Sequence, residues 1–360
     1  MKKICFFTPG LGGGGAERQV AILCNMLVEK GYETTVVSYL DEPDQYELSE
    51  KVNRVRINVK GKRIRKYFSF FSFFFRLNVD CLICFQPAEA FMAMPSFLLR
   101  PKVKVIVGER NLAYGNLLWF ENINYYLFYR RANSIISNNY SQKNHLYKTY
   151  PWLRKKLNVI TNYTDVEKFV FSHSLQNDIK RIAVFARYTP QKNYERFAEA
   201  IKLLKANTKL KFIIDWYGKN DTFTIDNKAT FESRIKQFNL SDCIITHDVV
   251  NNVQELLPLY DAICLPSLYE GFSNSISEAI SCGKVMLVSD VSDNSLMVHN
   301  DENGFLFDPL DVRSIADAFL KFFACDNKRV KEMEIKSREI AESLFDKERF
   351  VNGYIAEIEK

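Results

Sequence analysis

The chain has 360 residues, a length that predicts two domains of ordinary size. Hydrophobic residues make up 47% of the chain and charged residues 26%, and this composition excludes a disordered chain, a collagen-like chain and a small disulfide-stapled scaffold. The net charge of +6 is the balance of 49 basic and 43 acidic residues, and it is uneven: residues 1–165 carry 24 basic and 13 acidic side chains, whereas residues 166–360 carry 25 and 30.

Short apolar runs alternate with longer amphipathic ones along the chain. In the first half, the pattern predicts a helix over residues 16–30 and strands at residues 4–8, 33–40, 79–85 and 103–107. The pattern restarts after about residue 175, with a helix over 194–204 and strands at 181–186, 210–216, 244–246, 262–265 and 285–289. Two such series predict two doubly wound α/β domains with parallel sheets. We expect these domains to span residues 1–168 and 169–342, followed by a terminal helix over 343–360.

A glycine-rich loop, residues 10–15, follows the first strand and opens the first helix. Glycines let the backbone come close to a ligand, and a helix N-terminus offers free N–H groups to an anion. Three of the glycines also satisfy the G-x-G-x-x-G pattern of a dinucleotide site. However, the acidic residues that such a site needs, Asp41 and Glu42, lie somewhat too far along the chain. An NAD-dependent enzyme and a plain flexible turn remain alternatives.

The strongest signal lies in residues 265–279, where a strand ends and a helix begins. Between them, a loop carries Glu270 and Gly271, at the carboxyl end of the sheet where ligands bind in open α/β folds. Ser273 or Asn274 caps the helix, whose first amides can meet phosphate oxygens. Glu278 lies inside this helix, and its carboxylate can accept two hydrogen bonds from the hydroxyls of a ribose.

Two cations, Arg187 and Lys192, follow the first strand of the second series. Both could reach a diphosphate bound between the domains. Two fixed cations would stabilise a departing nucleoside diphosphate without a metal.

These segments together resemble a known family. The spacing of Glu270 and Glu278, with seven residues between them, resembles the signature of the family 4 retaining glycosyltransferases of the GT-B fold, and Arg187 with Lys192 resembles that family's diphosphate-binding pair. Residues 13–17, 159–165 and 303–306 are similar to three further motifs of the family, and all the matches run in the expected order.

The resemblance implies two Rossmann-like domains that face a central cleft, with the C-terminal helix crossing back to the first domain. It implies that the nucleotide sugar is a co-substrate and that no cofactor or divalent metal is required; the chain has no D-x-D motif and no histidine spacing typical of a metal site. The catalytic residues would be Arg187, Lys192 and Glu270. The donor-binding residues would be Gly14, Gly15, Gly271, Phe272, Ser273, Asn274 and Glu278.

A further motif concerns the acceptor. Residues 108–111, Gly-Glu-Arg-Asn, resemble the Ser-Glu-Arg-Asn stretch of members that add hexoses or N-acetylhexosamines to polyprenyl-diphosphate-linked glycans, as in the assembly of O-antigens and capsules. Gly108 replaces the serine of that motif. The resemblance places Glu109, Arg110 and Asn111 on the acceptor side of the cleft, with a structural ion pair as the alternative.

The densest basic segment, residues 60–66, runs directly into the phenylalanine-rich residues 67–75. This pattern favours contact with an anionic membrane surface through the phenylalanines and the nearby cations Lys62, Arg63, Arg65 and Lys66. A core helix with a solvated basic start and a nucleic-acid site are the alternatives.

Several features predict a cytoplasmic protein. No apolar run reaches the roughly 18 residues that a spanning helix needs, and the apolar start is too short for a signal peptide. The eight cysteines are scattered through apolar segments, and the one C-x-x-C, at Cys81 and Cys84, is interpreted as part of a buried strand.

We therefore expect a retaining glycosyltransferase that moves a hexose or N-acetylhexosamine from a nucleotide sugar, UDP-linked, to a lipid-linked glycan in surface polysaccharide biosynthesis. It would work as a peripheral protein on the inner face of the cytoplasmic membrane. A nucleotide-sugar epimerase of the same architecture and a non-catalytic sugar-nucleotide-binding subunit are the alternatives.

Overall fold

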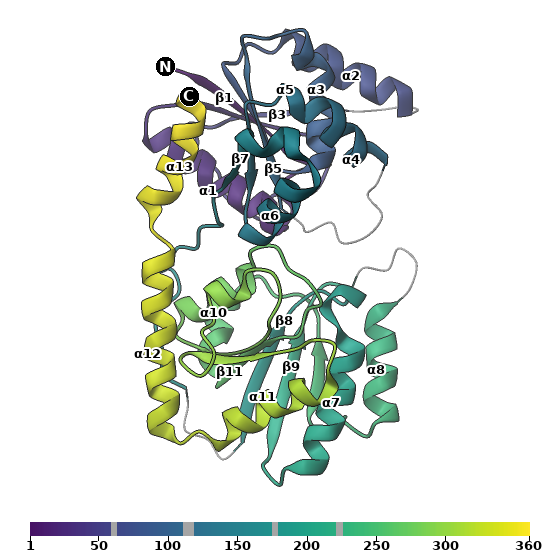
Figure 1. Ribbon diagram of the computed structural model, residues 1–360, viewed down its shortest axis with the longest axis vertical. Coiled ribbons are helices and arrows are strands. Elements are labelled where there is room, and N and C mark those ends of the chain that lie inside the picture. The colour runs from purple at the N-terminus through teal and green to yellow at the C-terminus, as the bar shows by residue number, and fades with distance from the viewer. Residues whose placement is uncertain (59–62, 111–118, 175–178, 221–225) are drawn as a thin grey trace. The chain divides into compact units, whose positions relative to one another are not determined.

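The computed structural model describes residues 1–58, 63–110, 119–174, 179–220 and 226–360. The chain forms two compact units, one of residues 1–163 with 347–360 and the other of residues 164–346 (Figure 1). The sequence had placed the corresponding boundaries after residues 168 and 342. The segment after residue 163 belongs to the second unit because Arg338 donates hydrogen bonds to the carbonyl oxygens of Val166 (3.1 Å) and Phe169 (2.8 Å).

The first unit contains a sheet of seven parallel strands in the order β3-β2-β1-β4-β5-β6-β7. The strands are β1 (Lys3–Phe7), β2 (Glu33–Ser38), β3 (Asn53–Arg56), β4 (Cys81–Cys84), β5 (Lys104–Glu109), β6 (Ser134–Ser137) and β7 (Leu157–Val159). The four strands predicted for this half are confirmed as β1, β2, β4 and β5. The sequence did not reveal β3, because its Asn-Arg-Val-Arg sequence is polar and its side chains are largely exposed.

Helices cover both faces of this sheet. One face packs on α2, α3, η1, α6 and η2 in a single apolar core that includes Phe70, Phe74 and Phe97. The opposite side holds α1 and the C-terminal α13, which contact each other. The helices of this unit are α1 (Gly15–Glu29), α2 (Arg63–Arg76), α3 (Pro87–Leu98), α4 (Trp119–Ile123), the π-helix η1 (Asn124–Phe128), α5 (Tyr129–Arg131), α6 (Tyr140–Thr149), the 3-10 helix η2 (Pro151–Lys156) and α13 (Lys347–Glu359).

The terminal helix α13 returns to the first unit, as expected. Its Glu359 pairs with Lys2 (2.5 Å), and its Glu348 pairs with Lys30 (2.7 Å). The helix begins at Lys347, since residues 345–346 interrupt the helical hydrogen bonding between α12 and α13.

The second unit contains a sheet of six parallel strands in the order β10-β9-β8-β11-β12-β13. The strands are β8 (Lys180–Phe185), β9 (Phe212–Tyr217), β10 (Ile244–His247), β11 (Ala262–Leu265), β12 (Val285–Ser289) and β13 (Gly304–Phe307). The five strands predicted for this half are confirmed as β8 to β12. The helices are η3 (Pro190–Lys192), α7 (Tyr194–Asn207), α8 (Asn227–Gln237), α9 (Val253–Leu256), η4 (Leu257–Leu259), α10 (Asn274–Ser281), η5 (Asn294–Leu296), α11 (Val312–Ala324) and α12 (Asn327–Leu344).

Strand order locates a ligand crevice in each unit. The chain runs outward from β1 to β3 and then returns to place β4 on the other side of β1; in the same way β11 lies on the other side of β8. Loops separate at the carboxyl ends of the two strands that flank such a reversal, and ligands bind there in open α/β sheets. The candidate residues after β1, β8 and β11 therefore lie where the topology leaves room for a ligand.

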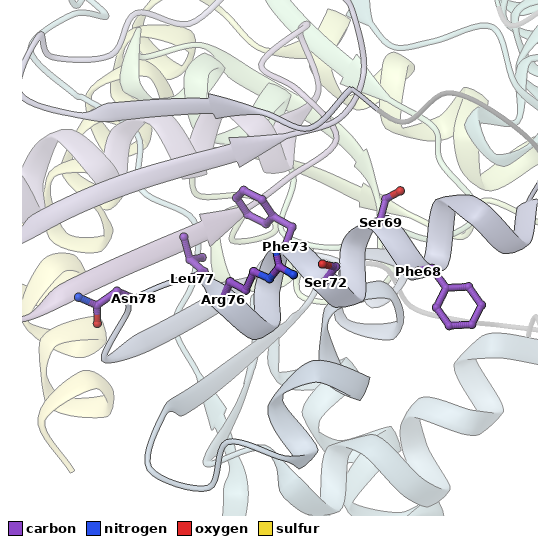
Figure 2. A pocket seen from close by; sticks show the side chains of 7 residues that line it. All are labelled: Phe68, Ser69, Ser72, Phe73, Arg76, Leu77 and Asn78. Carbon is purple, nitrogen blue, oxygen red and sulfur yellow. The ribbon is translucent and has the colours of Figure 1, made fainter.

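The phenylalanine-rich segment forms most of α2, and its phenylalanines divide between two environments. Phe70 (3% exposed) and Phe74 (0%) lie in the core, whereas Phe68 is 70% exposed. Figure 2 shows the side chains that line a groove of about 680 Å³ along this helix, among them Phe68, Phe73 and Arg76. One side of α2 thus lies in the core, as the core-helix interpretation expects, and the other side is exposed, so contact of that side with a membrane stays a prediction.

The side chains of residues 62–66 lie outside the described part of the chain. Within the described ranges, every helix is too short or too polar to span a bilayer.

Candidate active site

Two loops meet at the reversal point of the second sheet. One follows β8 and contains the short helix η3, and the other follows β11. The N–H of Leu268 donates to the carbonyl oxygen of Gln191 (2.8 Å), and the Gln191 side-chain amide donates to the carbonyl oxygen of Tyr269 (2.8 Å). The two loops therefore hold each other in place.

An ion pair joins the same loops. The Lys192 ammonium lies 2.5 Å from Oε1 of Glu270, and the two side chains are only 13% and 9% exposed. Because water is largely excluded, the attraction between the two charges is stronger than in a solvent-exposed pair, and the cost of taking both charges out of water offsets it. The pair places one fixed cation and one fixed carboxylate side by side at the carboxyl end of the sheet.

The backbone of Glu270 is held by Ser292, from the loop after β12. The Glu270 N–H donates to the Ser292 hydroxyl oxygen (3.1 Å), and that hydroxyl donates to the Glu270 carbonyl oxygen (2.7 Å). Ser292 has a φ of 53°, in the left-handed region that non-glycine residues seldom adopt. Sequence reasoning missed this residue, although its place just after a strand of the same sheet was a usable signal.

Arg187 lies in the loop after β8 and is exposed. The turn that carries it passes close to the start of the loop after β9, where a Cβ on Gly218 would overlap the carbonyl oxygen of Ala186. Glycine at this position lets the two chain segments approach. The structure therefore puts Arg187 and Lys192 on one loop, and Lys192 is paired there with Glu270.

Helix α10 begins at the same edge of the sheet. Of the two predicted caps, Ser273 is the N-cap, and the Ser273 hydroxyl oxygen accepts a hydrogen bond from the N–H of Ile276 (3.4 Å). The Ser275 hydroxyl donates to the carbonyl oxygen of Phe185 (2.9 Å), which ties the first turn of α10 to the end of β8. Phe272 is buried at 4% exposure, and Glu278 at 8%. The helix, whose first residue is Asn274, thus presents its N-terminal, partially positive end at this edge of the sheet, next to the loop that contains Gly271.

A second polar cluster stiffens the ends of β8, β9 and β10. The buried carboxylate of Asp215 accepts hydrogen bonds from Arg181 (2.9 Å) and from Tyr260 (3.1 Å), and it lies 2.7 Å from Nε2 of His247. The His247 ring stacks on Tyr217 with ring centroids 4.3 Å apart. This cluster compensates a buried charge and fixes the strand ends; sequence reasoning missed Asp215, which sits inside an apolar strand with no motif around it.

In the first unit, the glycine loop follows β1 as predicted. Gly13 has a φ of 110°, which requires glycine, and Gly14 is the N-cap of α1, which begins at Gly15. Gly14 cannot cap with a side chain, so the first amides of the helix have no side-chain acceptor from that position. This arrangement suits an anion at the helix N-terminus.

The predicted acceptor-side residues are buried in two separate networks. Glu109 is 1% exposed and accepts hydrogen bonds from Tyr129 (2.6 Å), Tyr125 (3.1 Å) and Gln142 (3.0 Å). Burial raises the pKa of the Glu109 carboxyl to about 7, against the opposing effect of these hydrogen bonds.

Arg110 belongs to the second network. It donates to the side-chain oxygen of Asn162 (2.9 Å) and to the Tyr354 hydroxyl (2.5 Å), and its guanidinium lies 4.2 Å from the centre of the Phe85 ring. In the part of the chain that the structure describes, no ion pair joins Glu109 to Arg110, and each side chain has structural hydrogen-bond partners instead. Asn111 lies outside the described residues.

The raised pKa of Glu109 predicts a pH-dependent stability. The unfolded carboxyl loses its proton near pH 4.5, whereas the folded one keeps it until about pH 7, so stability falls as the pH rises through this window. The cost above pH 7 is about 3 kcal/mol. Glu109→Gln is expected to flatten this fall, measured as the free energy of unfolding in urea across the same window.

Glu89→Gln is a second test of the same effect, because burial raises the pKa of the Glu89 carboxyl to about 7 as well. The single variants should each remove part of the fall, and the double variant more than either. An unchanged pH profile in Glu109→Gln would contradict the assignment of a buried, protonated carboxyl.

Two protein-family models match this chain. Residues 165–339 match the family model described as "Glycosyl transferases group 1", and residues 13–168 match the model described as "Glycosyltransferase Family 4". The two matches together run through most of both units.

Two curated bacterial relatives are similar in sequence. A "UDP-Gal:alpha-D-GlcNAc-diphosphoundecaprenol alpha-1,3-galactosyltransferase" of Escherichia coli is 28% identical over 177 residues, which is 46% of this chain and 45% of that protein, so the match spans slightly less than half of either. An "N-acetylgalactosamine-N,N'-diacetylbacillosaminyl-diphospho-undecaprenol 4-alpha-N-acetylgalactosaminyltransferase" of Campylobacter jejuni is 22% identical over 368 residues, 96% of each chain.

Solved structures share the fold across the whole chain. Sucrose-phosphate synthase of Thermosynechococcus elongatus superposes with a TM-score of 0.82 at 16% identity, covering 99% of this chain and 98% of the other. The Anabaena protein Alr3699/HepE, solved in complex with UDP-glucose, superposes with a TM-score of 0.81 at 14% identity, covering 100% of both chains. At these identities, the likeness establishes the architecture alone.

Proposed function

Because the chain belongs to the family 4 glycosyltransferases and has the GT-B fold, we propose that it transfers a hexose or N-acetylhexosamine from a UDP-linked sugar to a lipid-linked saccharide, with retention of the anomeric configuration. Both curated relatives are named for transfer to a saccharide on diphospho-undecaprenol. These names support a lipid-linked acceptor and a place in the synthesis of surface polysaccharide.

One observation carries the proposal: the buried Lys192–Glu270 pair between two interlocked loops at the reversal point of the second sheet. Lys192 and Arg187 would stabilise the negative charge that develops on the departing diphosphate, aided by the N-terminal amides of α10. Glu270 would accept hydrogen bonds from hydroxyls of the donor sugar, and Glu278 from those of the ribose.

The anomeric configuration of the sugar is retained if the acceptor hydroxyl attacks the anomeric carbon from the side of the leaving group. The bond between the anomeric carbon and the diphosphate oxygen breaks, a bond from that carbon to the acceptor oxygen forms, and the acceptor proton passes to the departing diphosphate. The diphosphate then acts as the base, so the proposal needs neither a dedicated protein base nor a divalent metal.

The acceptor side of the proposal rests on the first unit. Glu109 and Arg110 would act there by fixing the end of β5, and Asn111 is the third residue of the proposed acceptor-side motif. The exposed side of α2 would contact the anionic inner face of the cytoplasmic membrane, together with the cations Lys62, Arg63, Arg65 and Lys66.

The first test is a thermal-shift panel of UDP, GDP, ADP, UDP-sugars and NAD, each in EDTA. A ligand present at about 100 times its dissociation constant stabilises the native state by about 2.7 kcal/mol, so UDP and one or more UDP-sugars are expected to raise the melting temperature without metal. A shift with NAD alone would contradict the proposal. Product analysis with and without a diphospho-undecaprenol-linked saccharide then separates a transferase from an epimerase, which needs no acceptor.

A further inference from the structure

Residues 122–164 contain seven lysines and arginines and no aspartate or glutamate. The segment runs from the end of α4 through η1, α6 and η2 to β7, all in the first unit. No part of the proposed function uses these cations. Because these cations lie in a stretch without acidic residues, their charges are not cancelled within it, and the stretch attracts a partner of negative charge.

Aromatic side chains gather on the surface of this segment. Tyr126 on η1 is 54% exposed and Trp152 on η2 is 39% exposed, and their ring centroids lie 5.2 Å apart. The Trp152 indole N–H donates to the carbonyl oxygen of Tyr125 (3.0 Å), which fixes the orientation of the ring. Leu127, next to Tyr126, is 53% exposed. The π-helical turn of η1 thus leaves two consecutive apolar residues in solvent, a geometry that is frequent at functional sites.

Two of the cations lie over aromatic rings of this segment. The guanidinium of Arg130 lies 5.5 Å from the Trp152 ring, and that of Arg154 lies 4.5 Å from the Tyr147 ring, with its Nε donating to the Tyr147 carbonyl oxygen (2.9 Å). Lys155 beside it is exposed. Across the described ranges, none of the seven cations has a carboxylate within 4.0 Å.

Two of the seven cations hydrogen-bond to backbone carbonyls inside the unit and are not counted in the surface defined below. Arg131 donates to the carbonyl oxygens of Arg100 (3.0 Å) and Val103 (2.9 Å), and Lys156 donates to that of Ala132 (2.7 Å). We define the η1–η2 surface by the outward-facing residues Tyr126, Leu127, Arg130, Trp152, Arg154 and Lys155.

We propose that the η1–η2 surface docks on the headgroups of an anionic lipid bilayer. Tryptophan and tyrosine prefer the boundary between headgroups and acyl chains because an apolar ring and a polar tip are both satisfied there. Each lysine or arginine near an anionic leaflet strengthens binding by about fivefold. The surface belongs to the same helical layer as α2, whose Phe68 is exposed, so one layer of the unit carries two sets of interfacial side chains.

Nucleic acid fits this surface less well. Single strands bind by stacking bases on free aromatic faces. The Trp152 ring instead packs against Tyr126 and lies beneath Arg130. Aromatic rings in contact with each other and with cations suit a lipid interface, where rings and charges are both satisfied.

The test compares vesicle binding of three full-length proteins: the wild type, the triple variant Arg130→Glu, Arg154→Glu, Lys155→Glu, and the control Lys209→Glu, Lys211→Glu, Lys236→Glu. The control makes the same change of net charge at exposed lysines of the second unit. Wild type and control are expected to float with phosphatidylglycerol-containing vesicles and not with pure phosphatidylcholine. The triple variant should bind at least about 100-fold more weakly. Equal flotation of the triple variant and the control would overturn the proposal.

Trp152 supplies a readout at the surface itself. In a Trp119→Phe background, lipids brominated near the headgroup should quench the remaining tryptophan emission, and adding Trp152→Phe should remove most of that quenching, since Trp216 is fully buried. Quenching that is unchanged in Trp152→Phe, or binding of an oligonucleotide in place of vesicles, would each contradict docking through this surface.

The docking proposal rests on the proposed function only for the lipid-linked acceptor. Docking and sugar transfer can therefore be contradicted separately. Sugar transfer to detergent-solubilised acceptor should persist in the triple variant. If transfer in detergent falls as far as vesicle binding, the cations act on the acceptor itself and docking is overturned. If no protein transfers sugar but flotation follows the expected pattern, the proposed function fails and the docking surface stands.

Discussion

Replacing Lys192 by alanine is expected to lower kcat for sugar transfer by about 100- to 1000-fold, the usual cost of removing one fixed group that stabilises charge in a transition state. Lys192 is 13% exposed and lies 2.5 Å from Glu270, so its ammonium is held in place before the substrate arrives. The charge on the diphosphate grows as the sugar departs and is not yet developed in the bound donor, so the dissociation constant for the UDP-sugar should change much less than kcat.

The matched control is Lys205→Ala, which removes an exposed lysine paired with Asp242 on the surface of the same unit. It should leave kcat and the melting temperature nearly unchanged. Since Lys192→Ala leaves the Glu270 carboxylate nearly buried without its partner, circular dichroism and melting must show that the variant is folded. A folded Lys192→Ala protein with wild-type kcat would remove Lys192 from the site.

Replacing Arg110 by methionine is expected to destabilise the first unit by about 3 kcal/mol. The change removes the donors that serve the buried oxygens of Asn162 and Tyr354, and an unsatisfied buried polar group costs about 1 to 3 kcal/mol. It also removes the cation stacked on Phe85. Because Tyr354 lies on α13, faster amide hydrogen exchange in residues 347–359 is the direct readout.

Lys347→Met is the control for this prediction. Lys347 lies on the same helix, but its pair with Glu29 is exposed, and its loss should cost at most a few tenths of a kcal/mol. Unchanged exchange in α13 together with a raised KM for the acceptor would assign Arg110 to acceptor binding rather than to the support of the helix.

Much of the candidate site was predictable because its chemistry is local in the chain. A cap of α10 at Ser273 or Asn274 follows from the residue types and the spacing to the apolar positions behind them, and the structure selects Ser273. The placement of Lys192 after a strand and of Glu270 after another followed from the alternation of strands and helices, since carboxyl ends of parallel strands meet at one edge. The family resemblance agreed with these placements over nearly the whole chain.

Partners that come from distant segments were not predictable. Ser292 holds the backbone of Glu270 across 22 positions, and Asp215 gathers Arg181, Tyr260 and His247 from three other strands or loops. No periodicity marks such a residue, because a single polar side chain in an apolar strand has the same local pattern whether or not partners surround it.

The division between sequence and structure is clearest in α2. Its composition showed an apolar helix with a basic start and left the core and the membrane as alternatives. The helix buries Phe70 and Phe74 and exposes Phe68, because only one side of a helix can face the sheet. By itself, the sequence determined the two α/β series, the loops that carry the charged residues and the family; these depend on neighbours within a few positions. Tertiary structure alone decided which charges pair, which are buried and which apolar side chains stay in solvent, since these depend on strand order and on contacts between residues far apart in the chain.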